Sequence, residues 1–303
     1  MLKLHWFLLL LTITSGGLQA KPLQLAEQYE VFDGKTIDLR QVVGHQPVYI
    51  KFWATWCLEC RKELPSLQNA FEKYRDKISM YAVNLNINET DEYIRRLKTK
   101  NNLTIPIVMD DNGSIASNFQ FVGTPFHVLI NAKGDVVYTT YKDDEALQQQ
   151  LQLLAASSQS TISSQPEAPT KNTIPTLPNG FSLVYFSATW CDWYMKDIHP
   201  EMTSNCLSAT KLVNDLHQQT KIPLFAYVTH LWTEQKDVDE YVKKFSIGYP
   251  VNIDADNQLA QHYRTTDYPS LLLFKDGKEV KRFTEFDDTT EMSKTISKLA
   301  AEK

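Results

Sequence analysis

Residues 52–65 have the sequence FWATWCLECRKELP, and the run that leads into them, residues 48–53, is VYIKFW. Because this run is rich in β-branched and aromatic residues, it predicts a buried strand. Good helix formers follow Cys57 directly, so we expect Cys57 at a helix N-terminus. Unpaired backbone N–H groups and the helix dipole stabilise an anion there, which favours the reactive thiolate. Cys60 lies one turn further on, close enough for a disulfide with Cys57, and this geometry suits thiol–disulfide exchange.

A Cys-x-x-Cys pair can also be half of a zinc site or an inert structural bridge. A zinc site of this kind needs a second pair of ligands at matching spacing, and the sequence contains none. We therefore expect a redox-active pair at Cys57 and Cys60 and no bound metal. The structural interpretations remain the alternative.

The composition describes a globular chain of 303 residues, 43% hydrophobic and 22% charged, which is long enough for two domains. The formal net charge of -5 offers no electrostatic reason to expect a nucleic acid as partner.

The first 20 residues have the pattern of a signal peptide. Lys3 supplies the positive region, residues 6–13 the apolar core, and small residues lead to Ala20. We expect cleavage after Ala20 and a soluble protein in the periplasm or another exported compartment, where disulfides persist. The alternative is an uncleaved segment that anchors the chain to the membrane.

The pattern of strands and helices after the signal segment predicts an α/β sheet. An Asp-Gly pair at residues 33–34 predicts a hairpin within residues 31–39. The expected helices are residues 58–74 with a kink at Pro65, 91–100 and 112–119. The expected strands are an alternating one at residues 78–85, then 105–109, 128–131 and 136–141, the last two forming a hairpin.

Residues 155–180 are rich in Ser, Thr, Gln and Pro, which predicts a linker, and after it the pattern starts again. Residues 184–191 repeat the first strand and turn, residues 239–244 repeat 91–96, and residues 268–278 repeat Thr124-Pro125 and its hairpin. With Asp239 matched to Asp91, the second copy has about 14 extra residues between roughly positions 200 and 220. The expected domains are residues 23–155 and 179–303, joined by the linker at 156–178.

The first copy resembles the TlpA-like branch of the thioredoxin superfamily, which comprises extracytoplasmic thiol–disulfide oxidoreductases. The resemblance covers nearly all of residues 23–155 and is carried by these features in order: Asp33-Gly34-Lys35, Leu39, Gly44, residues 52–57, Cys60, Glu63-Leu64-Pro65, an inserted helix and strand at residues 91–109, and Gly123-Thr124-Pro125. It implies two tandem thioredoxin-like domains, each with a central mixed sheet flanked by helices. It also implies catalysis by Cys57 and Cys60, with no cofactor besides their disulfide.

The resemblance further implies that Pro125 and Pro269 follow cis peptide bonds and lie against the cysteine site. A cis X–Pro bond leaves the preceding backbone N–H and carbonyl facing outwards, where an extended substrate chain can pair with them. The substrate-binding residues expected on this basis are Trp56, Thr124 and Pro125. The alternative for both prolines is an ordinary trans turn.

Two charged residues are expected to modulate the pair. Lys51 stands where thioredoxin has a buried carboxylate, whereas the second copy has Tyr185. A cation there would favour the thiolate, and the alternative is a lysine whose amine reaches water. Glu59 between the cysteines would raise the thiol pKa, which suits a reductant better than a strong oxidant. Its alternative is a solvated acid at the helix start.

The second copy departs from the family at its active site, because Tyr194 stands where the second cysteine belongs. We expect Cys191 to keep its place at a helix N-terminus. Three hypotheses remain open: Cys191 traps mixed disulfides alone, it pairs with Cys206 if the chain turns at Pro200, or both thiols are idle. Tyr268 and Pro269 complete this second site. Soft side chains at helical spacing could bind Cu(I), but they are more often core or surface residues; they are Met195, His199, Met202 and Cys206.

The function expected from these features is the reduction of protein disulfides by Cys57 and Cys60. The partners are protein thiols and disulfides and a redox protein that donates electrons, and the second domain docks substrates or regulates. The rival function is a non-catalytic module that binds extended protein segments. The sequence lacks the pattern that thiol peroxidases use, which makes that function a weaker alternative. A copper-handling protein is the last alternative.

Overall fold

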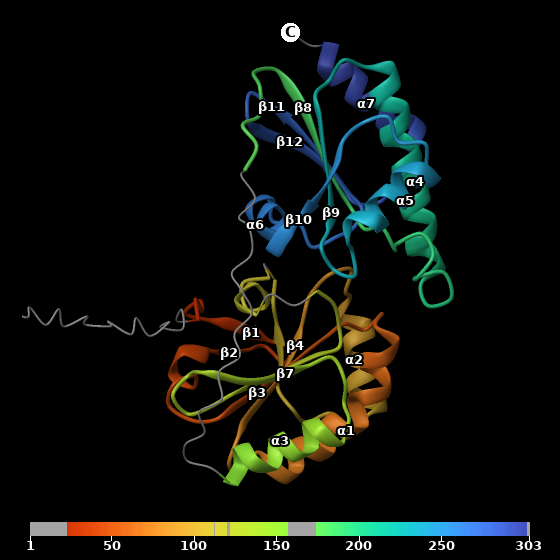
Figure 1. The fold of residues 1–303 in the computed structure, drawn as a ribbon. Coiled ribbons are helices and arrows are strands. Elements are labelled where there is room, and N and C mark those ends of the chain that lie inside the picture. Colours follow the sequence, from red (N-terminus) through yellow and green to blue (C-terminus); the bar gives the residue numbers. More distant parts are fainter. Residues whose placement is uncertain (1–22, 112, 120–121, 157–173, 302–303) are drawn as a thin grey trace, which may run out of the picture.

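The computed structural model describes residues 23–111, 113–119, 122–156 and 174–301 (Figure 1). They form two α/β units, which we call the first unit (residues 23–156) and the second unit (residues 174–301). The expected signal segment and residues 157–173 of the expected linker lie outside the described residues. Within the described residues, no helix is both long and apolar enough to cross a membrane.

The first unit contains a mixed sheet with the strand order β2-β1-β5-β4-β3-β6-β7. Strand β3 is central: it runs parallel to β4 and antiparallel to β6, and all six of its residues are buried. The strands are β1 (Tyr29–Val31), β2 (Lys35–Ile37), β3 (Val48–Trp53), β4 (Ser79–Asn84), β5 (Ile107–Met109), β6 (Phe126–Ile130) and β7 (Val136–Thr140). The helices are α1 (Leu58–Tyr74), α2 (Asp91–Lys100) and α3 (Glu145–Ala156), with short 3-10 turns at Leu39–Gln41 and Ala116–Asn118.

Most elements expected in this unit are present. Two expectations are corrected, and one helix of the unit was not expected. Strand β4 does not alternate, since five of its six residues are buried, so both faces of the sheet are covered at this strand. The helix expected at residues 112–119 is only the 3-10 turn Ala116–Asn118 in the described part. Helix α3 was not expected, although its buried Leu147, Leu151 and Leu154 have helical spacing.

The second unit repeats the topology of the first with a five-stranded sheet. Its strand order, β10-β9-β8-β11-β12, corresponds to β5-β4-β3-β6-β7 of the first unit. The parallel and antiparallel pairings are also the same. The strands are β8 (Phe181–Ser187), β9 (Leu224–Thr229), β10 (Val251–Asp254), β11 (Ser270–Lys275) and β12 (Lys278–Phe283). The helices are α4 (Pro200–Gln219), α5 (Gln235–Lys244), α6 (Gln258–Tyr263) and α7 (Thr289–Ala301), with a 3-10 turn at Ala255–Asn257.

The structure corrects the alignment of the two copies by one helical turn. Helices α2 and α5 both contain ten residues, so Asp91 corresponds to Gln235 and not to Asp239. The interval from Cys57 to Asp91 is 34 positions and that from Cys191 to Gln235 is 44, which leaves 10 extra residues instead of 14. The error arose because a shift of four residues keeps the same helical face inward.

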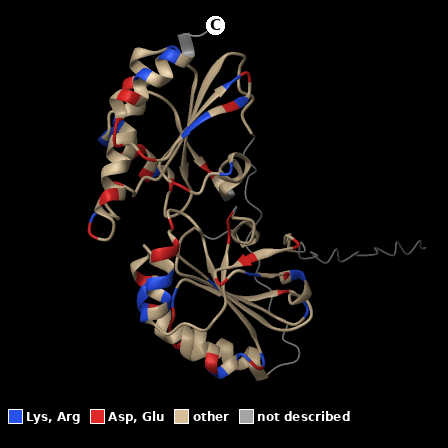
Figure 2. Cartoon of the chain, turned by 180° about the vertical axis from the view of Figure 1, so that it is seen from behind, with Lys and Arg blue, Asp and Glu red and all other residues tan. Residues whose placement is uncertain are grey.

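The two units pack together through a continuous apolar region. A single cluster of buried hydrophobic residues runs from the first unit into the second and includes Trp56, Cys57, Trp190, Cys191 and Leu231. A separate cluster lies wholly within the second unit. Charged residues of both signs are mixed along the helices of both units (Figure 2).

Candidate active site

The cysteine pair of the first unit lies at the start of α1, as the sequence predicts. Strand β3 ends at Trp53, and Cys57 is the N-cap residue of α1. A disulfide joins Cys57 to Cys60 with 5.2 Å between their Cα atoms, and the backbone N–H of Cys60 points at the Cys57 Sγ at 3.1 Å. The same N–H remains available to a thiolate at Cys57 when the bond is reduced.

The cis-proline segment lies beside this pair. The peptide bonds Thr124–Pro125 and Tyr268–Pro269 are both cis, as the resemblance implies. In the first unit, Phe126 of β6 lies opposite Phe52 of β3, so the segment before Phe126 runs beside the turn that leads to Cys57. Thr124 is buried, and Trp56 has no exposed surface.

Lys51, on β3, lies in a buried polar cluster. Its amine is fully buried and lies 2.6 Å from the Oε2 of Glu63, so the alternative in which the amine reaches water is wrong. His127 lies opposite Lys51 in the β3–β6 register, which brings its Nε2 to 3.3 Å from the same carboxylate oxygen. The Nδ1 of His127 is 2.7 Å from the hydroxyl of Tyr49. We call Tyr49, Lys51, Glu63 and His127 the polar cluster.

Burial and pairing shift the protonation of the polar cluster in opposite directions. Burial lowers the pKa of Lys51 and of His127. Burial alone would raise the pKa of Glu63, but its contacts with His127 and Lys51 hold that pKa below its ordinary value. Glu63 is therefore ionised at neutral pH, and Lys51 depends on it for charge compensation. The sequence alone indicates no role for Glu63, because spacing along the chain does not show that β3 and α1 bring the two charges together.

Glu59 is solvent-exposed and forms an ion pair with Lys62 at 2.6 Å, in which both side chains are more than half exposed. This arrangement matches the alternative of a solvated acid at the helix start. A pair in contact with water has little influence on its surroundings, so Glu59 carries no argument for the direction of electron flow.

Glu89 is a buried carboxyl group that contacts the turn before Cys57, and no sequence pattern pointed to it. Its Oε1 accepts from the Thr55 backbone N–H at 2.6 Å and from Asn84 Nδ2 at 2.9 Å, and its Oε2 lies 2.6 Å from Thr55 Oγ1. Burial raises the pKa of Glu89 to about 7, although the three hydrogen bonds lower it in part. Glu89 therefore holds the turn before Cys57 and changes charge near neutral pH.

The Glu89→Gln variant is expected to lose part of the pH dependence of stability. The folded chain holds a proton on Glu89 up to pH about 7, whereas the unfolded chain releases it near the ordinary pKa of 4.5. The free energy of unfolding of the wild-type chain should thus fall as the pH rises from 5 to 8, with Glu89 contributing about 1–3 kcal/mol. Glutamine keeps the hydrogen bonds of the protonated carboxyl. Urea unfolding at both pH values measures the difference, and an equal fall in both chains would contradict this assignment.

The second unit contains a disulfide between Cys191 and Cys206, with 6.2 Å between their Cα atoms. Cys191 is not at a helix N-terminus, which corrects our expectation. The chain forms turns after it, and α4 begins only at Pro200, nine positions later, with His199 as its N-cap. The turn at Pro200 brings Cys206, in the second turn of α4, back to Cys191.

The possible Cu(I) ligands after Cys191 take part in a disulfide and in packing contacts. Cys206 is bonded to Cys191, and Met195 is buried in the apolar cluster that crosses the two units. His199 lies against the ring of Tyr93 with 4.4 Å between centroids. Among the described residues, no group of three or more His, Cys, Asp and Glu side chains is arranged to hold a metal ion.

The structure brings the expected sites of the two units into contact. Trp56 lies against Trp190 with 5.2 Å between ring centroids, and the hydroxyl of Tyr194 accepts from the Leu58 backbone N–H at 3.3 Å. Tyr268 is buried at the same junction. Cys57 and Cys191 are each at most 2% exposed. No sequence pattern predicted this contact, because it depends on how two folded units pack.

Comparison with known proteins places the first unit among thiol–disulfide oxidoreductases. The model of the AhpC/TSA family matches residues 17–139. Sporulation thiol-disulfide oxidoreductase A of Bacillus subtilis (strain 168) is 31% identical over 129 residues, which cover 41% of this chain and 78% of that protein. Thiol-disulfide oxidoreductase ResA of Bacillus thuringiensis subsp. konkukian (strain 97-27) is 30% identical over 105 residues, 35% of this chain.

The chain spans 60% of the length of that ResA relative. Among solved structures, StoA from Bacillus subtilis is 27% identical, with a TM-score of 0.37, and the match covers 42% of this chain and 96% of that one. The two curated relatives described above are both named as thiol–disulfide oxidoreductases. Residues 17–139 thus match the AhpC/TSA family model, and the chain belongs to the family of thiol–disulfide oxidoreductases that includes its Bacillus subtilis relative.

Proposed function

We propose that the chain is an extracytoplasmic thiol–disulfide oxidoreductase of the TlpA-like branch, which reduces protein disulfides through Cys57 and Cys60. The observation that carries the proposal is the position of Cys57: it caps α1 and is bonded to Cys60 one turn further on. The signal pattern of residues 1–20 supports the exported location. The repeated strand order supports two tandem thioredoxin-like domains.

The reaction begins when an external dithiol reduces the Cys57–Cys60 bond. The Cys57 thiolate, held by the Cys60 backbone N–H and the start of α1, attacks one sulfur of a substrate disulfide. The other substrate sulfur leaves as a thiolate, and Cys57 is now joined to the substrate. The Cys60 thiolate then attacks the Cys57 sulfur, which releases the second substrate thiolate and restores the Cys57–Cys60 disulfide. Two electrons pass to the substrate in each cycle.

The substrate chain lies along the Thr124–Pro125 segment, where its backbone pairs with the peptide groups once the second unit has uncovered them. Trp56 and Thr124 are buried in the closed arrangement of the two units. Substrate access therefore requires the second unit to move off this face. The proposed role of the second unit is to control that access.

Catalysed reduction of insulin tests this function. With dithiothreitol as the electron source, the wild-type chain is expected to accelerate precipitation of the insulin B chain well above the rate with dithiothreitol alone. A rate equal to that background would contradict the proposal. Such a result would favour the rival function, a module that binds extended segments without chemistry.

A further inference from the structure

Corresponding residues of the two units make the contact between the two cysteine sites. Trp56 donates its indole N–H to the carbonyl of Ile87 at 2.6 Å, and Trp190 donates to Leu231 at 2.8 Å. These four residues occupy corresponding places in the two units, since each tryptophan directly precedes a cysteine. The site of one unit thus faces the same site of the other.

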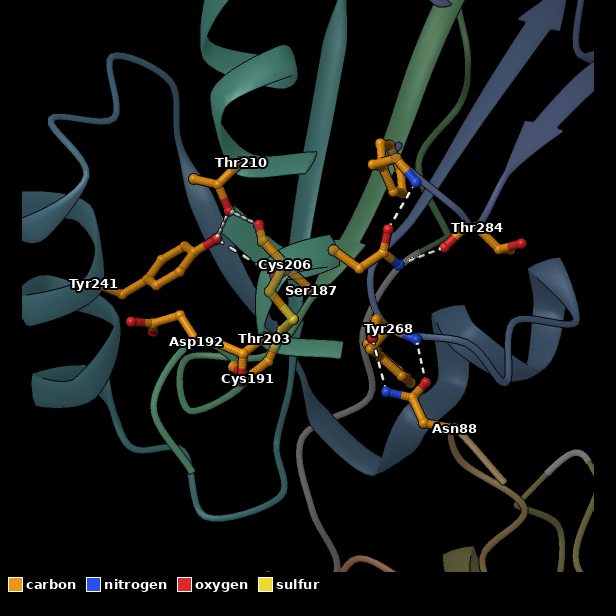
Figure 3. The surroundings of a disulfide bond; sticks show 12 residues. Asn88, Ser187, Cys191, Asp192, Thr203, Cys206, Thr210, Tyr241, Tyr268 and Thr284 are labelled. Carbon is orange, nitrogen blue, oxygen red and sulfur yellow. Dashed lines mark hydrogen bonds between the residues drawn. A yellow bond between two sulfur atoms is a disulfide. The ribbon is translucent and has the colours of Figure 1, made fainter. Parts of the chain in front are cut away.

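The loops after these carbonyls cross to the opposite unit. Asn88 follows Ile87 and Trp232 follows Leu231, and both adopt a left-handed backbone conformation with φ of 50° and 48°. The Asn88 Nδ2 donates to the Tyr268 carbonyl at 2.7 Å, and its Oδ1 accepts from the Tyr268 N–H at 2.6 Å (Figure 3). This two-way contact, beside the Cys191–Cys206 disulfide, uses the peptide groups just before Pro269.

Trp232 contacts the segment before the cis-proline of the first unit. Its backbone N–H donates to the carbonyl of Val122 at 2.5 Å, three positions before Pro125. A Cβ atom on Gly123 would lie 2.0 Å from the Trp232 Nε1, so only glycine permits this approach. Each unit therefore occupies the segment at which the other would receive an extended chain.

We propose that the Cys191–Cys206 pair is the resident redox partner of Cys57–Cys60, and that the two pairs exchange electrons directly across this contact. The proposal rests on the proposed function, to which it adds the immediate electron donor. Trp56 and Trp190, which directly precede Cys57 and Cys191, lie in one aromatic group with Trp232 and Tyr194. The four cysteines of the chain form only these two disulfides. If the second unit only covered the first site, it would not need a disulfide at Cys191, the residue that corresponds to Cys57.

The exchange moves two electrons from one cysteine pair to the other and needs no further oxidant or reductant. An external dithiol first reduces the Cys191–Cys206 bond while the two faces are apart. When the faces close, the Cys191 thiolate attacks the Cys57 sulfur, a Cys57–Cys191 bond forms and Cys60 leaves as a thiolate. The Cys206 thiolate then attacks the Cys191 sulfur and releases the Cys57 thiolate. One disulfide has replaced the other, and two electrons have moved to the first unit.

Two matched double variants test the exchange by trapping its intermediate, the Cys57–Cys191 disulfide. Cys60→Ser with Cys206→Ser leaves Cys57 and Cys191, whereas Cys60→Ser with Cys191→Ser leaves Cys57 and Cys206. After oxidation with oxidised glutathione, peptide mapping without reductant should find the Cys57–Cys191 bond in the first variant. Its yield should exceed that of the Cys57–Cys206 bond in the second at least about ten-fold. Equal yields, or no bond between the units, would overturn the proposal.

The added variant Gly123→Ala should lower the yield of the Cys57–Cys191 bond, because the added Cβ separates the faces. Gly248→Ala is the control, since a Cβ there meets nothing closer than 3.7 Å. An unchanged yield with Gly123→Ala would show that the Cys57–Cys191 bond forms without the observed contact. This result would overturn the proposal that electrons pass across that contact.

Stoichiometry provides a test that does not depend on these variants folding alike. The fully reduced wild-type chain, freed of reductant and mixed with excess insulin, should reduce two disulfides per chain. The Cys191→Ser, Cys206→Ser variant should reduce one, and the Cys57→Ser, Cys60→Ser variant none. A wild-type value of one, with Cys191 and Cys206 still as thiols, would overturn the exchange but leave the proposed function intact. A value of zero would instead contradict the function itself.

Discussion

Replacement of Cys57 by serine is expected to lower the rate of insulin reduction by about 10³-fold or more. A serine hydroxyl is not ionised near neutral pH, so it cannot attack a disulfide in place of the thiolate. The loss should appear in the rate at saturating substrate, because the segment around Thr124 and Pro125 is unchanged. The measurement is the same precipitation assay with purified wild-type and variant chains.

Cys60→Ser is the matched control, because it removes the same disulfide and leaves Cys57. This variant should attack insulin once and then remain joined to it, so a covalent complex sensitive to reductant accumulates while turnover stops. Mapping should place the bond at Cys57. Turnover by Cys57→Ser close to the wild-type rate, or a trapped complex at a cysteine of the second unit alone, would assign the chemistry to other residues.

Glu63→Ala is expected to destabilise the chain by about 3–5 kcal/mol, the largest effect on stability that we predict. Glu63 is the carboxylate next to the fully buried Lys51 amine, and alanine leaves that charge without a partner. Alanine is a good helix former, so α1 itself should not suffer. Denaturant unfolding at pH 7, where Glu63 is ionised, measures the change.

The double variant Lys51→Met, Glu63→Ala separates pairing from packing. Methionine fills a similar volume without charge, so this variant should recover about 1–3 kcal/mol relative to Glu63→Ala. Glu59→Ala breaks the exposed pair with Lys62 on the same helix and should cost less than about 1 kcal/mol. If Glu63→Ala and Glu59→Ala cost the same, the polar cluster does not depend on charge compensation.

Local patterns predicted the first unit well. The run of β-branched and aromatic residues at 48–53 and the charged segment at 91–100 correspond to β3 and α2 without any shift. Cys57 was placed at a helix start because helix formers follow it directly. These features depend on neighbours in the sequence, and β3 is additionally held by burial on both faces.

The features that were missed depend on residues far apart in the chain. Lys51 has Glu63 as its partner only because α1 packs on β3, and His127 joins them through the β3–β6 register. Cys191 lacks a helix start because the chain turns until Pro200, although the segment up to Cys191 copies the first unit. The contact of Asn88 with Tyr268 joins residues 180 positions apart, and no periodicity reports such a contact.

The reduction potential of the Cys57–Cys60 pair tests the central claim most directly. The chain is equilibrated in buffers of defined ratios of reduced to oxidised dithiothreitol or glutathione, quenched with acid and alkylated, and the peptide that carries both cysteines is quantified. We expect a reversible two-electron transition closer to the value of thioredoxin, about −270 mV, than to that of DsbA, about −120 mV. A potential near the DsbA value, or a pair that does not interchange with the buffer, would contradict a reductase that acts through these two cysteines.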